Sequence, residues 1–357
     1  MPKNEGLSVW VGTRKGAFVF RSRNRKTWSV DGPYFKGWDV HHVARDPRQP
    51  GRLYAAVNSA WFGPHIHAST DGGRKWAVSE AGLEIKSLPE TSLKRVWHIE
   101  PGAGDEPGVV YAGGEPGVLF RSGDWGKSWS EVTSLNNHPT REKWNPGAGG
   151  MCLHSIQCLG GGRVIIAISA AGAFRSTDSG ASWTPYNQGV RTDFQPEKFP
   201  EVGQCVHKLL AHPANPDMLY QQNHCGLYRG KFGGSRWTDV SRGSLSRFGF
   251  GLAVPAAEPE TMFTVPIDGA EYRCTPDGKF RVGRSRDGGK TWELLTRGLP
   301  QRNAHLLVLR EAMTSDRESP AGVYIGTTGG HLFHTADGGK SWAAMAEHLP
   351  PILSVSC

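Results

Sequence analysis

The chain has 357 residues, of which 38% are hydrophobic, and its 41 lysines and arginines outweigh 33 acidic residues to give a formal net charge of +8. The 47 glycines and 13 tryptophans are typical of a β protein with many turns. No stretch approaches the length of a membrane span, and the basic residues are scattered without an aromatic-basic module. We therefore expect neither a membrane partner nor a nucleic-acid partner.

The chain begins with Met1 to Gly6, which carry no apolar signal region, and this favours a cytoplasmic location. Residues 7–12 and 16–20 read as two strands, equivalent to the second and third strands of a unit that lacks its first. Six cysteines in a cytosolic chain of this size do not indicate a disulfide framework.

The next unit shows four strands in order. They are predicted at Val40 to Asp46, Arg52 to Val57, His65 to Ser69, and from near Trp76 onward. The prolines between the first two strands mark a turn.

The third and fourth of these strands are joined by a motif that recurs along the chain, S/T-x-D-x-G-x-x-W. Two degraded copies have Asn24 and Phe232 where the aspartate belongs. The motif closes on seven tryptophans spaced 48 to 55 residues apart: Trp28, Trp76, Trp129, Trp183, Trp237, Trp292 and Trp342. Seven strand-turn-strand copies at a period near fifty predict a single domain over residues 1–357, an all-β, seven-bladed β-propeller of four-stranded blades.

The end of the chain, residues 351–356, reads as one strand beyond the last full unit. We expect it to supply the missing inner strand of the first blade, because closure removes the open edges of a sheet array. Deletion of residues 351–357 should then unfold or aggregate the protein.

The repeat is similar to the Asp-box, or BNR, motif, and the chain resembles the sialidase-like, BNR-repeat propeller proteins over almost its whole length. The resemblance implies a fold more than a function. In the motif the Asp and the Ser or Thr satisfy backbone N–H groups of the turn. We expect a structural role for Asp71, Asp124, Asp178, Asp287 and Asp337.

Strand alternation predicts that the Asp boxes lie on one face and that the longer connections lie on the other, around the mouth of a central channel. The first strands of successive blades start there, and five of the six starts carry a histidine, at His41–His42, His98, His154, His207 and His305. Two of them read Cys-x-His, as Cys152–His154 and Cys205–His207, and positions i and i+2 of a strand point to the same side.

Two kinds of chemistry fit such a set. Neutral imidazoles bind one divalent transition metal (Zn, Cu, Fe or Mn), and the candidate ligands are His41, His98, His154, His207 and His224. Alternatively, histidine and carboxylate act as general base and acid. The candidate catalytic residues are then His154, His207, Glu201, Glu115 and Arg95, and the candidate substrate-binding residues are Trp61, Asn58, Asn223, Arg273 and Lys208. Inner-strand histidines that hydrogen-bond along a water-filled channel are the structural alternative.

The functional prediction is an enzyme that hydrolyses or eliminates a small-molecule or glycan ligand at a His-rich site, with metal assistance as an option. Sialidase activity is not expected, because the Phe/Tyr-Arg-Ile-Pro segment of sialidases is absent, and Phe20-Arg21-Ser22-Arg23 stands in its place. Xyloglucan-cleaving Asp-box enzymes pair two propellers around a cleft, whereas propeller polysaccharide lyases are the nearer analogy. A copper or iron oxidoreductase and a non-catalytic scaffold are the alternatives.

Overall fold

The computed structural model describes residues 6–147 and 149–357. Residues 1–5, on which the expectation about a signal region mainly rests, lie outside the described part. The chain divides into unit 1 (Met1–Val43, His212–Ala214 and Val240–Cys357) and unit 2 (Ala44–Ala211 and Asn215–Asp239). None of the described helices is long and apolar enough to cross a bilayer. The expectation of one domain over the whole chain stays a prediction.

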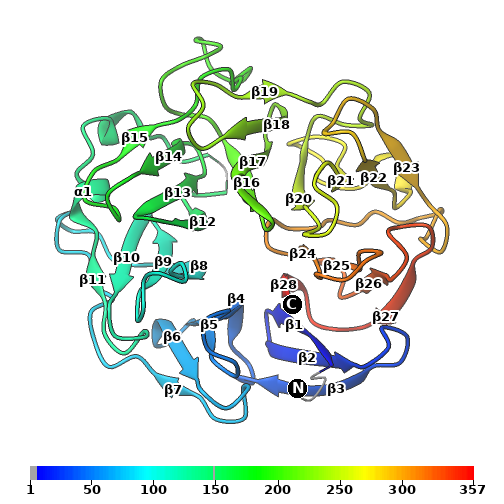
Figure 1. The fold of residues 1–357 in the computed structure, drawn as a ribbon, viewed down its shortest axis with the longest axis horizontal. Helices are drawn as coiled ribbons and strands as arrows, with labels where there is room; N and C mark the ends of the chain where they lie inside the picture. Colours follow the sequence, from blue (N-terminus) through cyan, green and yellow to red (C-terminus); the bar gives the residue numbers. More distant parts are fainter. Residues whose placement is uncertain (1–5, 148) are drawn as a thin grey trace. The chain divides into compact units, whose positions relative to one another are not determined.

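Within the described ranges the strands form seven four-stranded antiparallel sheets (Figure 1), which confirms the predicted all-β fold of seven propeller blades. Unit 1 holds three of these sheets. Their strands, in spatial order, are β28 (Ile352–Ser356), β1 (Leu7–Thr13), β2 (Gly16–Ser22) and β3 (Ser29–Tyr34); β20 (Gly249–Ala253), β21 (Met262–Pro266), β22 (Val282–Ser285) and β23 (Glu293–Leu295); and β24 (Met313–Ser315), β25 (Val323–Gly326), β26 (Leu332–Thr335) and β27 (Ala343–Ala346).

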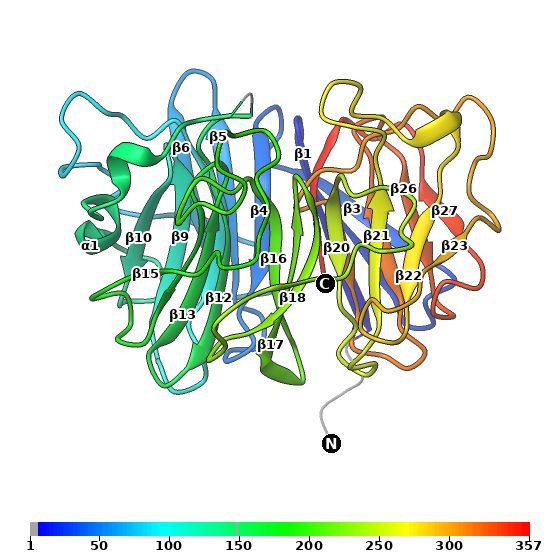
Figure 2. The same cartoon turned by 90° about the horizontal axis from the view of Figure 1, so that it is seen from above.

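Unit 2 holds two complete sheets and most of two others, and its strands run side by side with their connections at the two ends (Figure 2). The strands are β4 (Asp39–Arg45), β5 (Leu53–Ser59), β6 (Gly63–Ser69) and β7 (Ala77–Val78); β8 (Arg95–Pro101), β9 (Val110–Glu115), β10 (Val118–Ser122) and β11 (Ser130–Glu131); β12 (Leu153–Gly160), β13 (Arg163–Ile168), β14 (Gly172–Ser176) and β15 (Thr184–Pro185); and β16 (Val206–His212), β17 (Asn215–Asn223), β18 (Gly226–Lys231) and β19 (Thr238–Asp239). Short helical turns are α1 (Thr133–Asn136), η1 (Arg141–Lys143) and, in unit 1, η2 (Pro276–Gly278).

The strands of a sheet differ in burial according to their place in it. Strand β5 is buried on both faces over most of its length, whereas the outermost strands β3 and β7 are largely exposed. A strand buried on both faces reads as a continuous apolar run rather than an alternation.

Each Asp-box turn is held by its own side chains. Asp71 Oδ1 accepts hydrogen bonds from the backbone N–H groups of Arg74 and Lys75, both at 3.0 Å, and Ser69 Oγ accepts from the Gly73 N–H at 3.0 Å. The backbone N–H four residues after the aspartate donates in the same way to Asp124, Asp178, Asp287 and Asp337.

The Asp-box turn is also bonded to the turn between the first two strands of its own sheet. The Gly72 N–H donates to the Gly51 carbonyl, and the Ser179 N–H donates to the Gly162 carbonyl, both at 2.8 Å. An equivalent bond in unit 1 joins the Gly338 N–H to the Ala321 carbonyl at 3.0 Å. These two kinds of turn therefore share one end of each sheet, and the longer connections lie at the other end.

The degraded first copy of the motif keeps this turn by another route. Asn24 Oδ1 accepts from the backbone N–H groups of Lys26 and Thr27, both at 2.9 Å, while Ser22 Oγ accepts from the Arg25 N–H at 2.8 Å. An amide oxygen thus replaces the carboxylate as acceptor. The loss of one residue moves the hydroxyl contact from the fourth following residue to the third.

The C-terminal strand completes the first blade, as predicted. Strand β28 pairs antiparallel with β1, with Val355 opposite Val11 and Ser354 opposite Gly12, and Figure 1 shows the C-terminus beside β1. Ile352 and Val355 are buried in the core of unit 1 together with Val11.

The inner strand of the last blade differs from the prediction. The sequence placed its start at Asn303 to His305, but β24 begins at Met313. The predicted segment is instead bound to the β21–β22 connection, because the Ala304 N–H donates to the Gly278 carbonyl at 2.8 Å and the Thr275 N–H donates to the Leu306 carbonyl at 3.0 Å. His305 is therefore not at a strand start.

Candidate functional site

The first group of predicted site residues centres on Glu115, at the end of β9 in unit 2. Its Oε2 lies 3.2 Å from Arg95 Nε and accepts a hydrogen bond from Trp97 Nε1 at 3.2 Å. Antiparallel pairing places Arg95 directly opposite Glu115, so the ion pair follows from the register of β8 and β9. The Glu115 side chain is 12% exposed, and the Cys152 thiol lies 3.9 Å from the same oxygen. The carboxylate is therefore held by a guanidinium and an indole N–H at the end of a strand.

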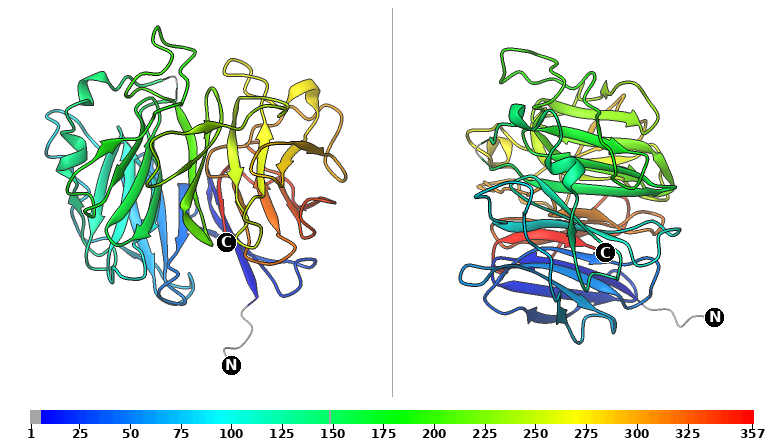
Figure 3. Two further views of the ribbon diagram at one scale, coloured as in Figure 1. Left: turned by 45° about the horizontal axis from the view of Figure 1, so that its top comes forward. Right: turned by 90° about the vertical axis from the view of Figure 1, so that its left-hand side faces the viewer.

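The short helix η1 contacts both the turn that follows Glu115 and Glu201, the second predicted carboxylate. Arg141 donates to the carbonyls of Pro116 and Gly117 at 2.9 and 2.8 Å, directly after Glu115. Lys143 Nζ lies 3.6 Å from Glu201 Oε2, and both of these side chains are exposed. One turn of helix thus contacts both the β9–β10 turn and the β15–β16 connection. In Figure 3 this connection is the green loop that extends away from the strands.

Two aromatic side chains stand in solvent at the β5–β6 turn. Trp61 is 90% exposed and Phe62 is 72% exposed, and their backbone N–H groups are both held by Ser59 Oγ at 3.2 Å. Asn58, the other predicted binding residue here, is half-buried in β5. The end of β5 and the start of β8 lie at the sheet end opposite the Asp-box turns, and these two strands pack on each other. A turn held by Ser59 therefore exposes two aromatic side chains at the same sheet end of unit 2 as Glu115.

The second group of predicted residues gathers on the fourth sheet of unit 2. Cys205, His207 and His224 place one possible ligand atom each so that all three atoms lie within 4.8 Å of one another. His207 is buried, whereas Cys205 and His224 are half-buried. The two imidazole rings have centroids 5.7 Å apart and planes at 65°. The prediction that Cys205 and His207 face the same side agrees with this arrangement.

The other Cys-x-His pair does not behave in this way. A register shift lies between Leu153 and Ser155 in β12, and such a bulge breaks the alternation of side chains. His154 Nε2 contacts the Val206 carbonyl at 2.9 Å, which makes it the protonated nitrogen, and Nδ1 lies 3.1 Å from Ser155 Oγ. His154 is therefore fully buried in contact with β16, and its two ring nitrogens are engaged in protein hydrogen bonds.

The remaining predicted residues are separate from these groups. Asn223 is buried, and its Oδ1 accepts from the Cys225 N–H at 3.3 Å within the β17–β18 turn. Arg273 in unit 1 has a positive φ of 46° and donates to the Ala270 carbonyl at 2.9 Å. Buried positions on inner strands are occupied by Lys208 on β16, His41 on β4 and His98 on β8.

Sequence reasoning gave too little weight to three residues. Trp97 was visible only as part of a strand start, and its indole N–H is a donor to Glu115. Cys205 was not among the candidate metal ligands, although the Cys-x-His spacing was the available signal. Phe194, whose ring centroid lies 4.8 Å from that of His224, comes from the long β15–β16 connection and carries no local motif.

The chain is similar to two curated enzymes. It is 28% identical over 302 residues to a xyloglucanase from Paenibacillus sp, an alignment that covers 72% of this chain and 27% of that protein. It is 24% identical over 331 residues to a xyloglucanase from Hypocrea jecorina (strain QM6a), covering 82% of this chain and 37% of that protein. The chain thus spans 27% to 37% of the length of these relatives.

Among solved structures, an ancestral GH74 enzyme matches with a TM-score of 0.63 at 17% identity, covering 96% of this chain and 40% of that chain. At this identity the similarity shows the fold alone. No protein-family model matches the chain.

Proposed function

We propose that the protein is a glycoside hydrolase that acts on a glycan chain. The observation that carries the proposal is the match to xyloglucanases over 72% of the chain, together with a held carboxylate and exposed aromatic rings in unit 2. The chain spans only 27% of that relative's length. The roles proposed below are therefore argued from the residues of this chain.

Glycosidic bonds are cleaved by a pair of carboxyl groups, one acting as acid and the other as base or nucleophile. Glu115 suits the second role, because Arg95 and the Trp97 N–H hold its carboxylate in a fixed position. Glu201 is the proposed acid, since its side chain is exposed and since η1 contacts both Glu201 and the turn that follows Glu115. The ion pair with Lys143 would have to open so that Glu201 can take up the proton that it then donates to the leaving-group oxygen.

Trp61 and Phe62 are the proposed platform for sugar rings. An aromatic face offers a large apolar area at low cost in conformational entropy, and sugar rings present apolar C–H faces that match it. The backbone of the platform is fixed by Ser59, so little ordering would be required on binding.

The test is release of reducing ends from xyloglucan and a panel of other plant and bacterial polysaccharides. Glu115→Gln and Glu201→Gln should each lower kcat by roughly 10²–10⁴-fold, the usual contribution of a general acid or base. Trp61→Ala should raise KM by about tenfold, a typical loss for an aromatic anchor.

The matched control is Glu197→Gln, which removes an exposed carboxylate from the same connection as Glu201. It should retain full activity. Wild-type protein that binds these glycans without cleaving them would reduce the proposal to recognition. Activity that survives in both Glu115→Gln and Glu201→Gln would disprove the assigned roles.

A further inference from the structure

We propose that Cys205, His207 and His224 form a transition-metal site in unit 2 that selects zinc over the hard cations. This site uses other residues than the proposed glycan site and does not depend on it. The three ligand atoms come from two short segments, the start of β16 and the β17–β18 turn, and lie within 4.8 Å of one another.

The backbone fixes the two segments against each other. The His224 N–H donates to the Cys205 carbonyl at 2.9 Å, so the turn that carries one ligand is bonded to the residue that carries another. The intervening residue is held from the opposite side, because His154 Nε2 donates to the Val206 carbonyl at 2.9 Å. The carbonyl groups of Cys205 and Val206 are thus both held by hydrogen bonds.

His154 is itself held in place, which makes it a positioning residue rather than a ligand. Its Nδ1 lies 3.1 Å from Ser155 Oγ, and the same hydroxyl oxygen accepts from the Leu209 N–H on β16 at 3.1 Å. The hydroxyl proton is then available to Nδ1, which leaves Nε2 as the N–H that donates to Val206. This hydrogen-bond chain links β12 to β16 on both sides of the His207 position.

The long β15–β16 connection covers the outer side of the cluster. Phe194 lies against His224 with ring centroids 4.8 Å apart, and the Asp193 N–H donates to Cys225 Sγ at 3.3 Å. The neighbouring Cys225 thiol is engaged by this connection, and it is not one of the three grouped ligand atoms.

The donor set determines the class of metal. Two imidazoles and a thiolate suit Zn²⁺ or copper, whereas Mg²⁺ and Ca²⁺ require oxygen ligands that this set does not supply. In a tetrahedral zinc site with Zn–S near 2.3 Å and Zn–N near 2.1 Å, ligand atoms lie roughly 3.3–3.6 Å apart. Side-chain rotations that bring the ligand atoms about an ångström closer together would give this geometry. Three protein ligands leave the fourth position open to water or a substrate atom.

Cobalt(II) is the probe for the test, because it takes tetrahedral zinc sites and reports a thiolate ligand by a charge-transfer band in the near ultraviolet. The full-length protein is freed of metal with a chelator and titrated with Co²⁺, and Zn²⁺ is then used to displace the cobalt. We expect one equivalent of cobalt, the charge-transfer band, and its loss on addition of zinc.

The variants are Cys205→Ser and His224→Gln, with Cys225→Ser as the matched control at the adjacent thiol. Cys205→Ser should abolish the band and weaken Zn²⁺ binding at least about 100-fold, while Cys225→Ser should keep both. Because His224 is half-buried in a turn, His224→Gln gives a second measurement if Cys205→Ser fails to fold. A zinc-dependent rise in Tm that is present in wild type and lost in either ligand variant supports the site.

Absence of stoichiometric cobalt binding in the wild type overturns the proposal, and so does a charge-transfer band that persists in Cys205→Ser. Failure of the glycan assay would leave these readouts unchanged, because none of them measures hydrolysis.

Discussion

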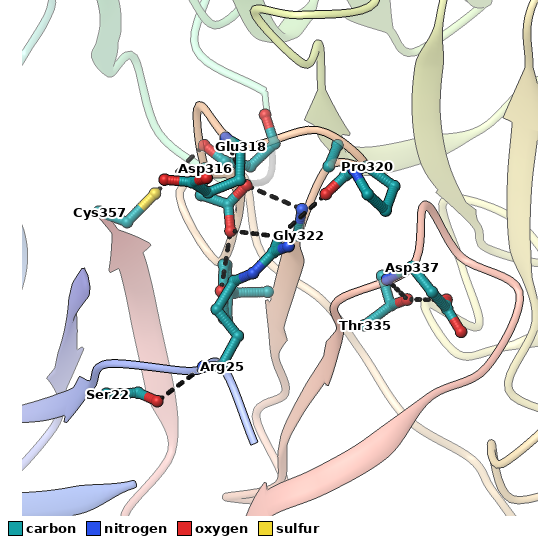
Figure 4. A network of polar contacts seen from close by, with 12 residues as sticks. Ser22, Arg25, Asp316, Glu318, Pro320, Gly322, Thr335, Asp337 and Cys357 are labelled. Carbon is teal, nitrogen blue, oxygen red and sulfur yellow. Dashed lines mark hydrogen bonds and ion pairs between the residues drawn. The ribbon is translucent and has the colours of Figure 1, made fainter. Parts of the chain in front are cut away.

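Arg25 Nη1 lies 3.3 Å from Asp316 Oδ2 and joins the degraded Asp-box turn of the first sheet to the β24–β25 turn of the neighbouring sheet in unit 1 (Figure 4). Arg25 also donates to the Pro320 carbonyl at 2.9 Å. The Asp316 side chain is 1% exposed and accepts from the Gly322 N–H at 2.8 Å and from the Tyr324 hydroxyl at 3.1 Å. A buried carboxylate is thus satisfied by one ion pair and several neutral donors.

Loss of this contact should destabilise the protein in a graded way. Arg25→Ala leaves Asp316 with its neutral donors, so we expect a loss of about 1.5–3 kcal/mol, the usual contribution of a hydrogen bond to a charged group. Asp316→Ala leaves several buried donors without an acceptor and should lower the free energy of unfolding by about 3–5 kcal/mol. Urea denaturation measures both. Arg23→Ala, an exposed change in the same turn, is the control, and an unchanged midpoint for Arg25→Ala would contradict the assignment.

The closure by β28 predicts the effect of a truncation. Removal of residues 351–357 exposes the edge of β1 and takes Ile352 and Val355 out of the unit 1 core. Each buried aliphatic side chain contributes roughly 1.5–3 kcal/mol, so the truncated chain should unfold at lower temperature or aggregate. Thermal melts and size-exclusion chromatography check this. A soluble truncation with the wild-type Tm would show that β28 is dispensable.

His67 on β6 predicts a pH dependence between mildly acidic and acidic conditions. Burial, and then the neighbouring His65, lower the pKa of His67 to about 4. The unfolded chain binds the proton at about pH 6.5, so stability is full above that value and falls as the pH drops toward about 4. His67→Gln should flatten the Tm profile in this window, whereas His65→Gln, which removes only the smaller of the two causes, should flatten it less. Parallel profiles for wild type and His67→Gln would refute the prediction.

Asp178 predicts a second window at lower pH. A hydrogen bond from the Ser182 hydroxyl, with further bonds from the turn, lowers the pKa of Asp178 to about 2. Its contribution to stability is therefore present above the unfolded value of about 3.9 and is lost as the pH falls toward 2. Asp178→Asn should be less stable than wild type at pH 7, and the difference should disappear near pH 2. A difference that is independent of pH would point to another cause.

The sequence by itself determined the fold, because the information is local and repeated. Each Asp-box turn is built from residues within eight positions of one another, as the bonds of Ser69 and Asp71 show, and seven such turns require seven sheets. The closing strand β28 was predictable because the first unit has only three strands of its own, while the C-terminal end has one strand more than its last unit needs. The prediction for His305 failed because the segment that contains it bonds to a distant loop at Gly278, which no local pattern reveals.

Only the tertiary structure determined which of the predicted site residues lie close together. The sequence treated Cys152–His154 and Cys205–His207 as equivalent, yet a bulge in β12 turns His154 toward Val206, while Cys205 and His207 come together with His224. Register within a strand is a local property, but a bulge and the approach of a turn from a neighbouring strand depend on pairing across the sheet. The residue types were therefore readable from the sequence, and their grouping was not.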